Sequence, residues 1–145
     1  MRKIALGVIV VLCSSWVQAR DTEYKLPIKD VLSMPEFAEK VGNDVKFIFG
    51  EEFKGVSYEK DLGEFTTNKK TNSMNKTDEF ACRWAMLSAL IQFKDKTKEL
   101  GGDAVVGLKS YYKKDTFSSQ TEYECHAGAL LAGVALHGKV VKLKQ

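Results

Sequence analysis

Acidic and imidazole side chains alternate along one segment of the chain. From Gln120 to Ala127 every second residue is polar, so Glu122, Glu124 and His126 share one face of the strand that this alternation predicts. Carboxylate and imidazole groups are suitable ligands for divalent ions. These three residues are the candidate ligands of a divalent metal, the only cofactor that we consider. Because they follow a straight line along one strand, the alternative is an ordinary solvated strand face.

Two cysteines, Cys82 and Cys125, are predicted to form a disulfide. Helical spacing places Cys82 on the apolar stripe of a long helix, and the strand alternation places Cys125 on the inward face of its strand. Both sulfur atoms therefore point into one core. A catalytic or redox role is not expected, because Cys125 and His126 point to opposite faces and the cysteines lack the close Cys-x-x-Cys spacing.

No enzyme signature occurs in the sequence. It contains no His-Glu-x-x-His, no Gly-x-Ser-x-Gly and no complete phosphate-binding loop. Gly128 and Gly133 have the glycine spacing of such a loop, but Val134 and Ala135 follow where lysine and serine or threonine are required. We therefore assign no catalytic residues and expect a protein without enzymatic activity.

The first nineteen residues have the layout of a secretory signal peptide. A positive start is followed by an apolar run and then by a small-residue ending, which are Met1-Arg2-Lys3, Ile4 to Cys13 and Val17-Gln18-Ala19. We expect cleavage near Ala19-Arg20 and a mature chain that is periplasmic or secreted, where disulfides persist. Residues 20–145 have the size of a single domain.

Cys13 offers an alternative, because a cysteine at the end of an apolar signal can carry the lipid of a lipoprotein. Such signals have a small residue immediately before the cysteine, and Leu12 is bulky. A lipoprotein is therefore not expected. The apolar run is also too short to cross a bilayer, and no other run approaches the ~20 residues that a helical span needs.

The charges of the chain nearly balance. Twenty-two lysines and arginines, two of them in the predicted signal peptide, face 19 acidic residues. Nucleic acids and anionic membrane surfaces usually bind a clustered basic excess, and the pairs Lys69-Lys70 and Lys113-Lys114 are short. We therefore expect no nucleic-acid partner, and favour an unknown protein or an envelope component.

The longest predicted element is a helix from about Thr77 to Leu100, with Thr77 as its N-cap and Gly101-Gly102 at its end. One apolar stripe runs along the whole helix, and a second is limited to its first half. A surface helix needs only one such stripe to face its core. The second stripe is either covered by helices in residues 28–41 or is a contact surface for a partner or a second copy. It consists of Phe80, Trp84, Leu87 and Ile91.

The remaining pattern predicts short strands around this helix. Residues 45–49 are expected to pair through a hairpin at 50–55 with a strand at 56–67. Residues 68–76 are polar and predict an irregular loop. Near the end of the chain, a buried strand at 129–136 is expected to meet a closing strand at 139–143 through a turn at His137-Gly138.

The segment Glu99 to Leu108, a helix end that runs through glycines into Asp-Ala-Val-Val-Gly, resembles the YbjQ-type domain. With the preceding helix and the apolar segment Ala129 to Leu143, the resemblance covers roughly the C-terminal half. It implies a small domain with one long helix on an antiparallel sheet, sometimes assembled into rings, and a heavy-metal-binding role. The chain is similar to the exported, disulfide-containing RcsF lipoprotein of that fold group. It has two mature cysteines rather than four and no good lipidation motif, so a sensor function is not carried over.

The segments Ala81 to Leu90 and Tyr123 to Gly128 give the mature chain its resemblance to a group of small exported proteobacterial proteins. Members of that group often carry the name excinuclease ATPase subunit. The activity in that name is not expected here, because the chain has no phosphate loop, no zinc-finger cysteines and no basic excess.

These observations predict an α+β fold of the YbjQ/RcsF-like type. It would have one long helix packed on a mostly antiparallel sheet and a short N-terminal helical segment. The leading functional hypothesis is a non-enzymatic periplasmic domain that binds a protein or envelope component. The alternative is a protein that binds a divalent metal or another small ligand.

Overall fold

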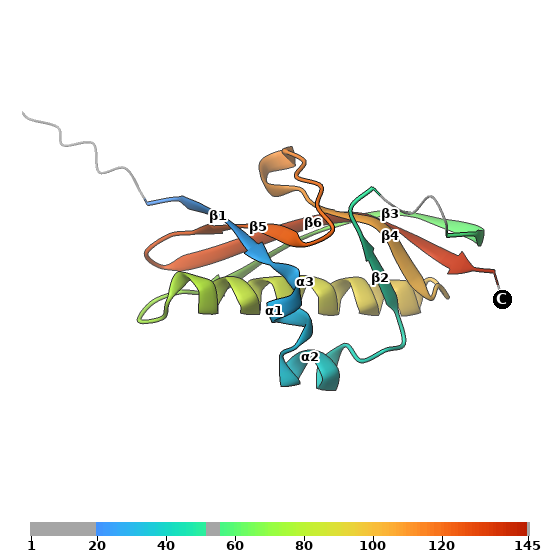
Figure 1. The fold of residues 1–145 in the computed structure, drawn as a ribbon, viewed down its shortest axis with the longest axis horizontal. Coiled ribbons are helices and arrows are strands. Elements are labelled where there is room, and N and C mark those ends of the chain that lie inside the picture. Colours follow the sequence, from blue (N-terminus) through green and yellow to red (C-terminus); the bar gives the residue numbers. More distant parts are fainter. Residues whose placement is uncertain (1–19, 52–55, 145) are drawn as a thin grey trace, which may run out of the picture.

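The computed structural model describes residues 20–51 and 56–144. The predicted signal peptide and Cys13 lie outside these residues. Figure 1 shows the elements in chain order, which are β1 (Thr22–Pro27), α1 (Ile28–Leu32), α2 (Pro35–Lys40), β2 (Lys46–Phe49), β3 (Tyr58–Asn72), α3 (Asp78–Glu99), β4 (Ala104–Ser110), the 3-10 turn η1 (Tyr112–Lys114), β5 (Glu122–Ala127) and β6 (Leu131–Leu143). Among the described helices, none is both long and apolar enough to span a membrane.

The strand β6 is the centre of the sheet. It pairs with β3 along one edge, and with β5 and then β4 along the other. β1 extends the sheet beyond β5, and β2 extends it beyond β4 in the one parallel pairing among the described strands. The register shifts between Asp61 and Glu64 in β3 and between Val106 and Lys109 in β4. Such irregularities bend strands and increase their twist.

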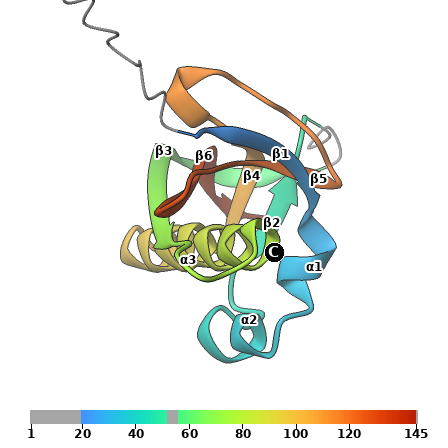
Figure 2. The ribbon, with the colours of Figure 1, turned by 90° about the vertical axis from the view of Figure 1, so that its left-hand side faces the viewer.

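The expected fold class is wrong. We expected one long helix packed on a mostly antiparallel sheet, but the structure is 43% strand and 30% helix, and its sheet curls into a half-barrel. Figure 2 shows α3 on the concave side, with β3 and β6 bending around it. The expectation of a YbjQ/RcsF-like α+β domain therefore gives the helix too large a share of the architecture.

Two strands are longer than predicted, which explains the error. β3 continues to Asn72 through the polar segment that predicted a loop. β6 runs unbroken through His137 and Gly138, where a turn was expected. The predicted hairpin between residues 45–49 and 56–67 is also absent from the described pairings, because β2 pairs with β4 and β3 pairs with β6. An edge strand with one solvated side needs few apolar residues, so β3 gives a weak alternating signal.

Local signals at both ends define α3. The Thr77 hydroxyl accepts a hydrogen bond from the Phe80 amide at 3.2 Å, and Asp78 lies in the first turn, where a negative charge is favourable. Gly101, with φ at 75°, ends the helix. Much of α3 is buried in the core between the sheet and α1, and eight of its residues are at 0% exposure, which are Ala81, Cys82, Ala85, Met86, Leu87, Ala89, Leu90 and Phe93.

A disulfide joins α3 to β5, and the prediction of this bridge is confirmed. Cys82 and Cys125 have their Cα atoms 5.9 Å apart and are both completely buried. Helical spacing and strand alternation were sufficient to place both sulfur atoms in the core.

The short helices α1 and α2 lie on the other side of α3 from β3 (Figure 2). Ile28 and Val31 of α1 are buried in the same core as Leu87. The Lys94 ammonium also donates a hydrogen bond to the Lys40 carbonyl at 2.9 Å, which connects the end of α2 to α3. The N-terminal segment therefore covers part of the helix surface that the sheet leaves open.

Candidate functional site

The pairing of β1 with β5 brings a polar cluster together on the outer face of the sheet. In this antiparallel register Glu23 lies opposite His126, and Lys25 lies opposite Glu124. Residues that are directly opposite share a face, and alternate residues of one strand do too. The four side chains therefore meet although they come from segments about 100 residues apart.

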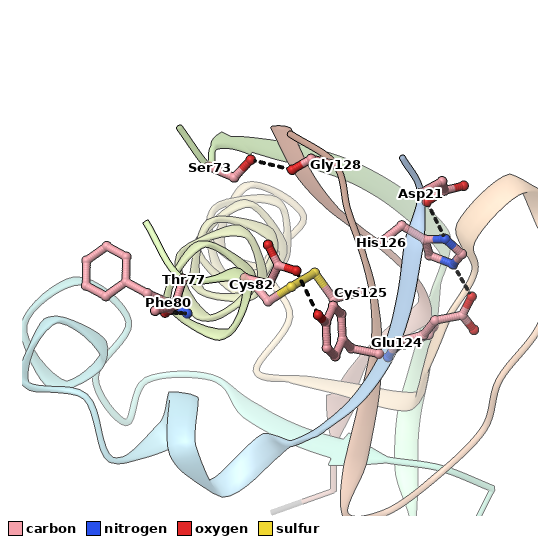
Figure 3. Close-up of a disulfide and its surroundings, with 12 residues drawn as sticks. Asp21, Ser73, Thr77, Phe80, Cys82, Glu124, Cys125, His126 and Gly128 are labelled. Carbon is pink, nitrogen blue, oxygen red and sulfur yellow. Dashed lines mark hydrogen bonds and ion pairs between the residues drawn. A yellow bond between two sulfur atoms is a disulfide. The ribbon is translucent and has the colours of Figure 1, made fainter. Parts of the chain in front are cut away.

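His126 is held by contacts on both ring nitrogens and on one ring face. Its Nδ1 lies 3.0 Å from Asp21 Oδ1, and its Nε2 lies 2.5 Å from Glu124 Oε1, as Figure 3 shows. The Tyr112 ring stacks on the imidazole, with centroids 3.7 Å apart and planes inclined by 9°. Neither nitrogen can bind a substrate or a metal without giving up a carboxylate contact.

Lys25 supplies the positive charge inside the cluster. Its ammonium donates to Glu23 and to Glu124 Oε2, the latter at 3.2 Å, and lies 4.4 Å from the centre of the Phe117 ring. Burial lowers the pKa of Lys25, but the hydrogen bonds to the two carboxylates outweigh burial, so the net shift is upward. The bond from Lys25 also lowers the pKa of Glu23.

A metal-ligand set exists in this cluster, with one member different from the predicted three. Ligand atoms of Glu23, Glu124 and His126 all lie within 4.8 Å of one another. Glu122 is exposed at the start of β5 and is not in this set. The donor types suit a divalent ion, but Lys25 already bonds both carboxylates. An ion would therefore have to displace the Lys25 ammonium.

A cavity of about 420 Å³ adjoins His126 on the outer face. Gly133 lies in its floor, because this residue pairs with His126 on one side and with Lys70 of β3 on the other. A β-carbon at Gly133 would meet the Tyr112 ring at 3.4 Å. Because Gly133 has no side chain, a hollow remains between Lys70 and the Tyr112 ring. Leu130 and Leu131 are among the other residues that line it.

Three large apolar side chains are exposed on two adjacent loops at the end of the molecule where α3 begins (Figure 1). Met74 is 51% exposed, Leu130 60% and Leu131 49%. Leu130 and Leu131 lie at the β5–β6 turn, and Met74 lies in the loop between β3 and α3. We call these three residues the apolar tip.

Ser73 fastens the two loops of the apolar tip to each other. Its amide donates to the Leu130 carbonyl at 3.0 Å, and its hydroxyl donates to the Gly128 carbonyl at 2.9 Å, a contact drawn in Figure 3. Ser73 itself is only 5% exposed. The two loops that carry the apolar tip are therefore held together by hydrogen bonds.

The second helical stripe is distributed over three environments. Leu87 is fully buried, Trp84 and Ile91 are half-buried against the core, and Phe80 is 39% exposed. Phe80 and Trp84 also line a shallow groove of about 440 Å³ beside Lys76. Phe80 is the most exposed of the four residues, and a partner could contact its side chain most readily.

The cluster partners and the apolar tip are the features that sequence reasoning missed. Glu23 and Lys25 join the cluster through the register of β1 with β5, and Asp21 lies just before β1, which one segment does not reveal. Within the apolar tip, Leu130 and Leu131 belong to a run that predicted a buried strand, and Met74 belongs to the segment that predicted a polar loop. The signal that could have located it is Gly128, which interrupts the strand pattern just before Leu130. The chain matches no family model, no curated protein and no solved structure.

Proposed function

We propose that the chain is a non-enzymatic binding domain whose contact surface is the apolar tip. The supporting observation is that Met74, Leu130 and Leu131 expose about half of their surfaces on loops that Ser73 ties together. Clustered exposed apolar residues are typical of interaction sites in globular proteins.

The chemistry of the polar cluster supports binding in preference to catalysis. Both nitrogens of His126 contact carboxylates, and the Lys25 ammonium lies between the carboxylates of Glu23 and Glu124. A general base must reach a substrate proton, and a nucleophile needs a free base beside it. Within the described residues, both cysteine sulfurs are bonded to each other. The cluster is best explained as a brace that fixes β1 and η1 on the sheet.

Export to the periplasm or to the exterior is part of the proposal. The buried Cys82–Cys125 bridge supports it, because structural disulfides persist mainly in oxidising compartments. Membership of the group of small exported proteobacterial proteins is proposed as well, and it rests on the segments Ala81 to Leu90 and Tyr123 to Gly128.

Photo-crosslinking in cells that express the full chain tests the contact surface. A benzophenone amino acid replaces Leu130, and in a control it replaces Leu100, which is 37% exposed at the opposite end of α3. We expect an adduct at position 130 that disappears when Met74→Ser is added, and no such adduct at position 100. Equal labelling at both positions, or none at 130, would contradict the proposal.

A divalent-metal site is the second candidate function, because Glu23, Glu124 and His126 offer three ligand atoms within 4.8 Å of one another. Calorimetric titration with zinc tests it. Binding that is lost in His126→Gln and kept in Glu122→Gln would support the site. The absence of a saturable heat in the parent protein would remove this candidate.

A further inference from the structure

We propose that the apolar tip docks on an anionic lipid bilayer. In this arrangement Leu130 and Leu131 enter the boundary between head groups and acyl chains, and Lys70 and Lys76 bind lipid phosphates. The inference rests on the proposed function and names the class of partner. It relies on the local distribution of charge, since the net charge of the chain provides no argument for an anionic surface.

The backbone of the β5–β6 turn is suited to an apolar medium. The Gly128 amide donates to the Leu131 carbonyl at 2.8 Å, and the Gly128 carbonyl accepts from Ser73 and from the Arg20 guanidinium. The Leu130 carbonyl accepts from the Ser73 amide. Polar backbone groups that leave water must have internal partners. These contacts give internal partners to the Gly128 amide and to the carbonyls of Gly128, Leu130 and Leu131.

The turn also carries no charged side chain. Residues 128–133 read Gly-Ala-Leu-Leu-Ala-Gly. These six residues therefore bring no ionised side chain of their own to a bilayer boundary, where desolvating one would be costly.

Cationic side chains flank the leucines. Lys70 lines the cavity that Leu130 and Leu131 border, and Lys76 lies two residues beyond Met74. Within the described parts of the chain, neither lysine belongs to an ion pair. Two neighbouring carboxylates have partners, because Asp78 pairs with Arg20 and Asp21 contacts His126 and Lys113, while Glu79 in the first turn of α3 is exposed. The Lys76 ammonium also donates a hydrogen bond to the Asn72 carbonyl at 3.2 Å. Because neither lysine is held in an ion pair, both can contact lipid phosphates.

The size of the apolar tip favours a lipid surface over a protein. A stable protein interface usually buries more than about 1,000 Å² around aromatic or arginine anchors. Three aliphatic side chains at a narrow end do not provide such a surface. Shallow insertion with a cationic flank needs only a few apolar residues and a few lysines, since apolar burial and attraction to anionic lipids add together.

Vesicle co-sedimentation tests the inference with protein purified from cells that express the full chain. The vesicles contain equal parts of phosphatidylcholine and phosphatidylglycerol, or phosphatidylcholine alone. We expect at least about tenfold stronger partitioning onto the anionic vesicles, and a loss of that preference in high salt. Equal partitioning onto both vesicles, or none onto the anionic ones, would overturn the inference.

Two paired variants separate the leucines from the charges. One variant combines Leu130→Ser with Leu131→Ser, and the other combines Lys70→Glu with Lys76→Glu. Each should weaken partitioning onto the anionic vesicles by at least about tenfold. The matched controls are Leu32→Ser with Leu100→Ser, which are exposed away from the apolar tip, and Lys46→Glu with Lys60→Glu, which make the same charge change. Equal losses in variants and controls would refute the specific site.

The two proposals fail in different ways. A protein adduct at position 130 together with no vesicle binding would leave the proposed function standing and reject the lipid surface. If the double leucine variant and the double lysine variant both still bind the vesicles, the lipid site is rejected even if crosslinking succeeded. Thermal melting of each variant identifies any that lose the native fold, and in that case the more conservative Leu130→Ala and Lys70→Gln variants replace them.

Discussion

Arg20 and Asp78 join the start of the described chain to the first turn of α3. The two guanidinium nitrogens lie 2.8 and 3.0 Å from the two carboxylate oxygens of Asp78. The Tyr24 hydroxyl donates to the same carboxylate at 2.7 Å. This cluster connects the edge strand β1 to the helix, and it places a negative charge where the helix dipole favours one.

The Asp78 carboxylate makes the stability of the fold depend on pH. The hydrogen bonds from Arg20 and then Tyr24 lower the pKa of Asp78 from 3.8 to about 2. Because the folded-state pKa is below the unfolded one, the contribution is fully present above about pH 4 and is lost as the pH falls through about 2. We expect Asp78→Asn to melt about 2 to 4 °C below the parent at pH 7. Thermal melts at pH 7 and near pH 2 measure the difference in melting temperature between the parent and Asp78→Asn. This difference should nearly vanish near pH 2.

Asp44 provides a control for this prediction. Its pair with Lys98 is 3.6 Å long and both side chains are more than half exposed. Asp44→Asn should change the melting temperature little, since exposed ion pairs contribute weakly. A difference for Asp78→Asn that stays constant from pH 7 to pH 2 would show that its ionisation does not stabilise the fold.

The disulfide should dominate the stability of the domain. Cys82 and Cys125 are 43 residues apart in the sequence, and closing a loop of this length in the unfolded chain corresponds to about 4 kcal/mol. We expect Cys82→Ala with Cys125→Ala to lower the free energy of unfolding by roughly that amount. Urea titration measures the change, and reductant should weaken the parent but not the double variant. A loss below about 1 kcal/mol would contradict the entropic account.

A buried hydroxyl on β5 should be dispensable. Tyr123 is 1% exposed, and its hydroxyl is the one buried side-chain polar atom without a hydrogen-bond partner among the described residues. Burial also raises the pKa of this side chain. Removing an unpartnered polar group is expected to be neutral or to stabilise by about 1 kcal/mol.

Urea titration of Tyr123→Phe and Tyr24→Phe compares the two kinds of hydroxyl. The Tyr24 hydroxyl donates to Asp78, so its removal should lower the urea midpoint, while Tyr123→Phe should keep or raise it. A clear decrease for Tyr123→Phe would mean that its hydroxyl has a partner, such as an internal water.

Two glycines of β6 should differ in how strongly an added methyl group destabilises the fold. A β-carbon at Gly138 would lie 2.8 Å from Val105 Cγ1 and 3.0 Å from Leu108 Cδ1. Overpacking of this kind typically costs about 1 to 3 kcal/mol, so Gly138→Ala should lower the urea midpoint. Gly133→Ala, whose nearest contact would be 3.4 Å, should change it little. Equal effects would show that β6 relaxes around the added atom.

Sequence reasoning succeeded where a pattern is local. Thr77, the acidic first turn and Gly101 marked the ends of α3 because capping involves only neighbouring residues. The Cys82–Cys125 bridge could be predicted because each cysteine occupies a definite phase of its own element. Both conclusions needed no knowledge of the sheet topology.

It failed where distant segments decide the outcome. The half-barrel depends on the length of β3 and β6 and on their pairing from end to end. The polar residues of β3 have no pattern from which this pairing could be predicted. At the His126 cluster the alternation found Glu124 correctly, but Glu23 and Lys25 enter through the register of β1, and Asp21 is positioned just before that strand. No spacing within a single strand contains this information.

The position of β6 in the chain has a consequence for the order of folding. This strand spans residues 131–143 and provides the partner for β3, β4 and β5. None of those strands can join a common sheet while β6 is still being synthesised, and the nascent segments before it can form only local helix and the separate β2–β4 and β1–β5 pairs. Sheets built on such distant pairings also fold slowly. The complete sheet should therefore form only after residues 131–143 have been synthesised.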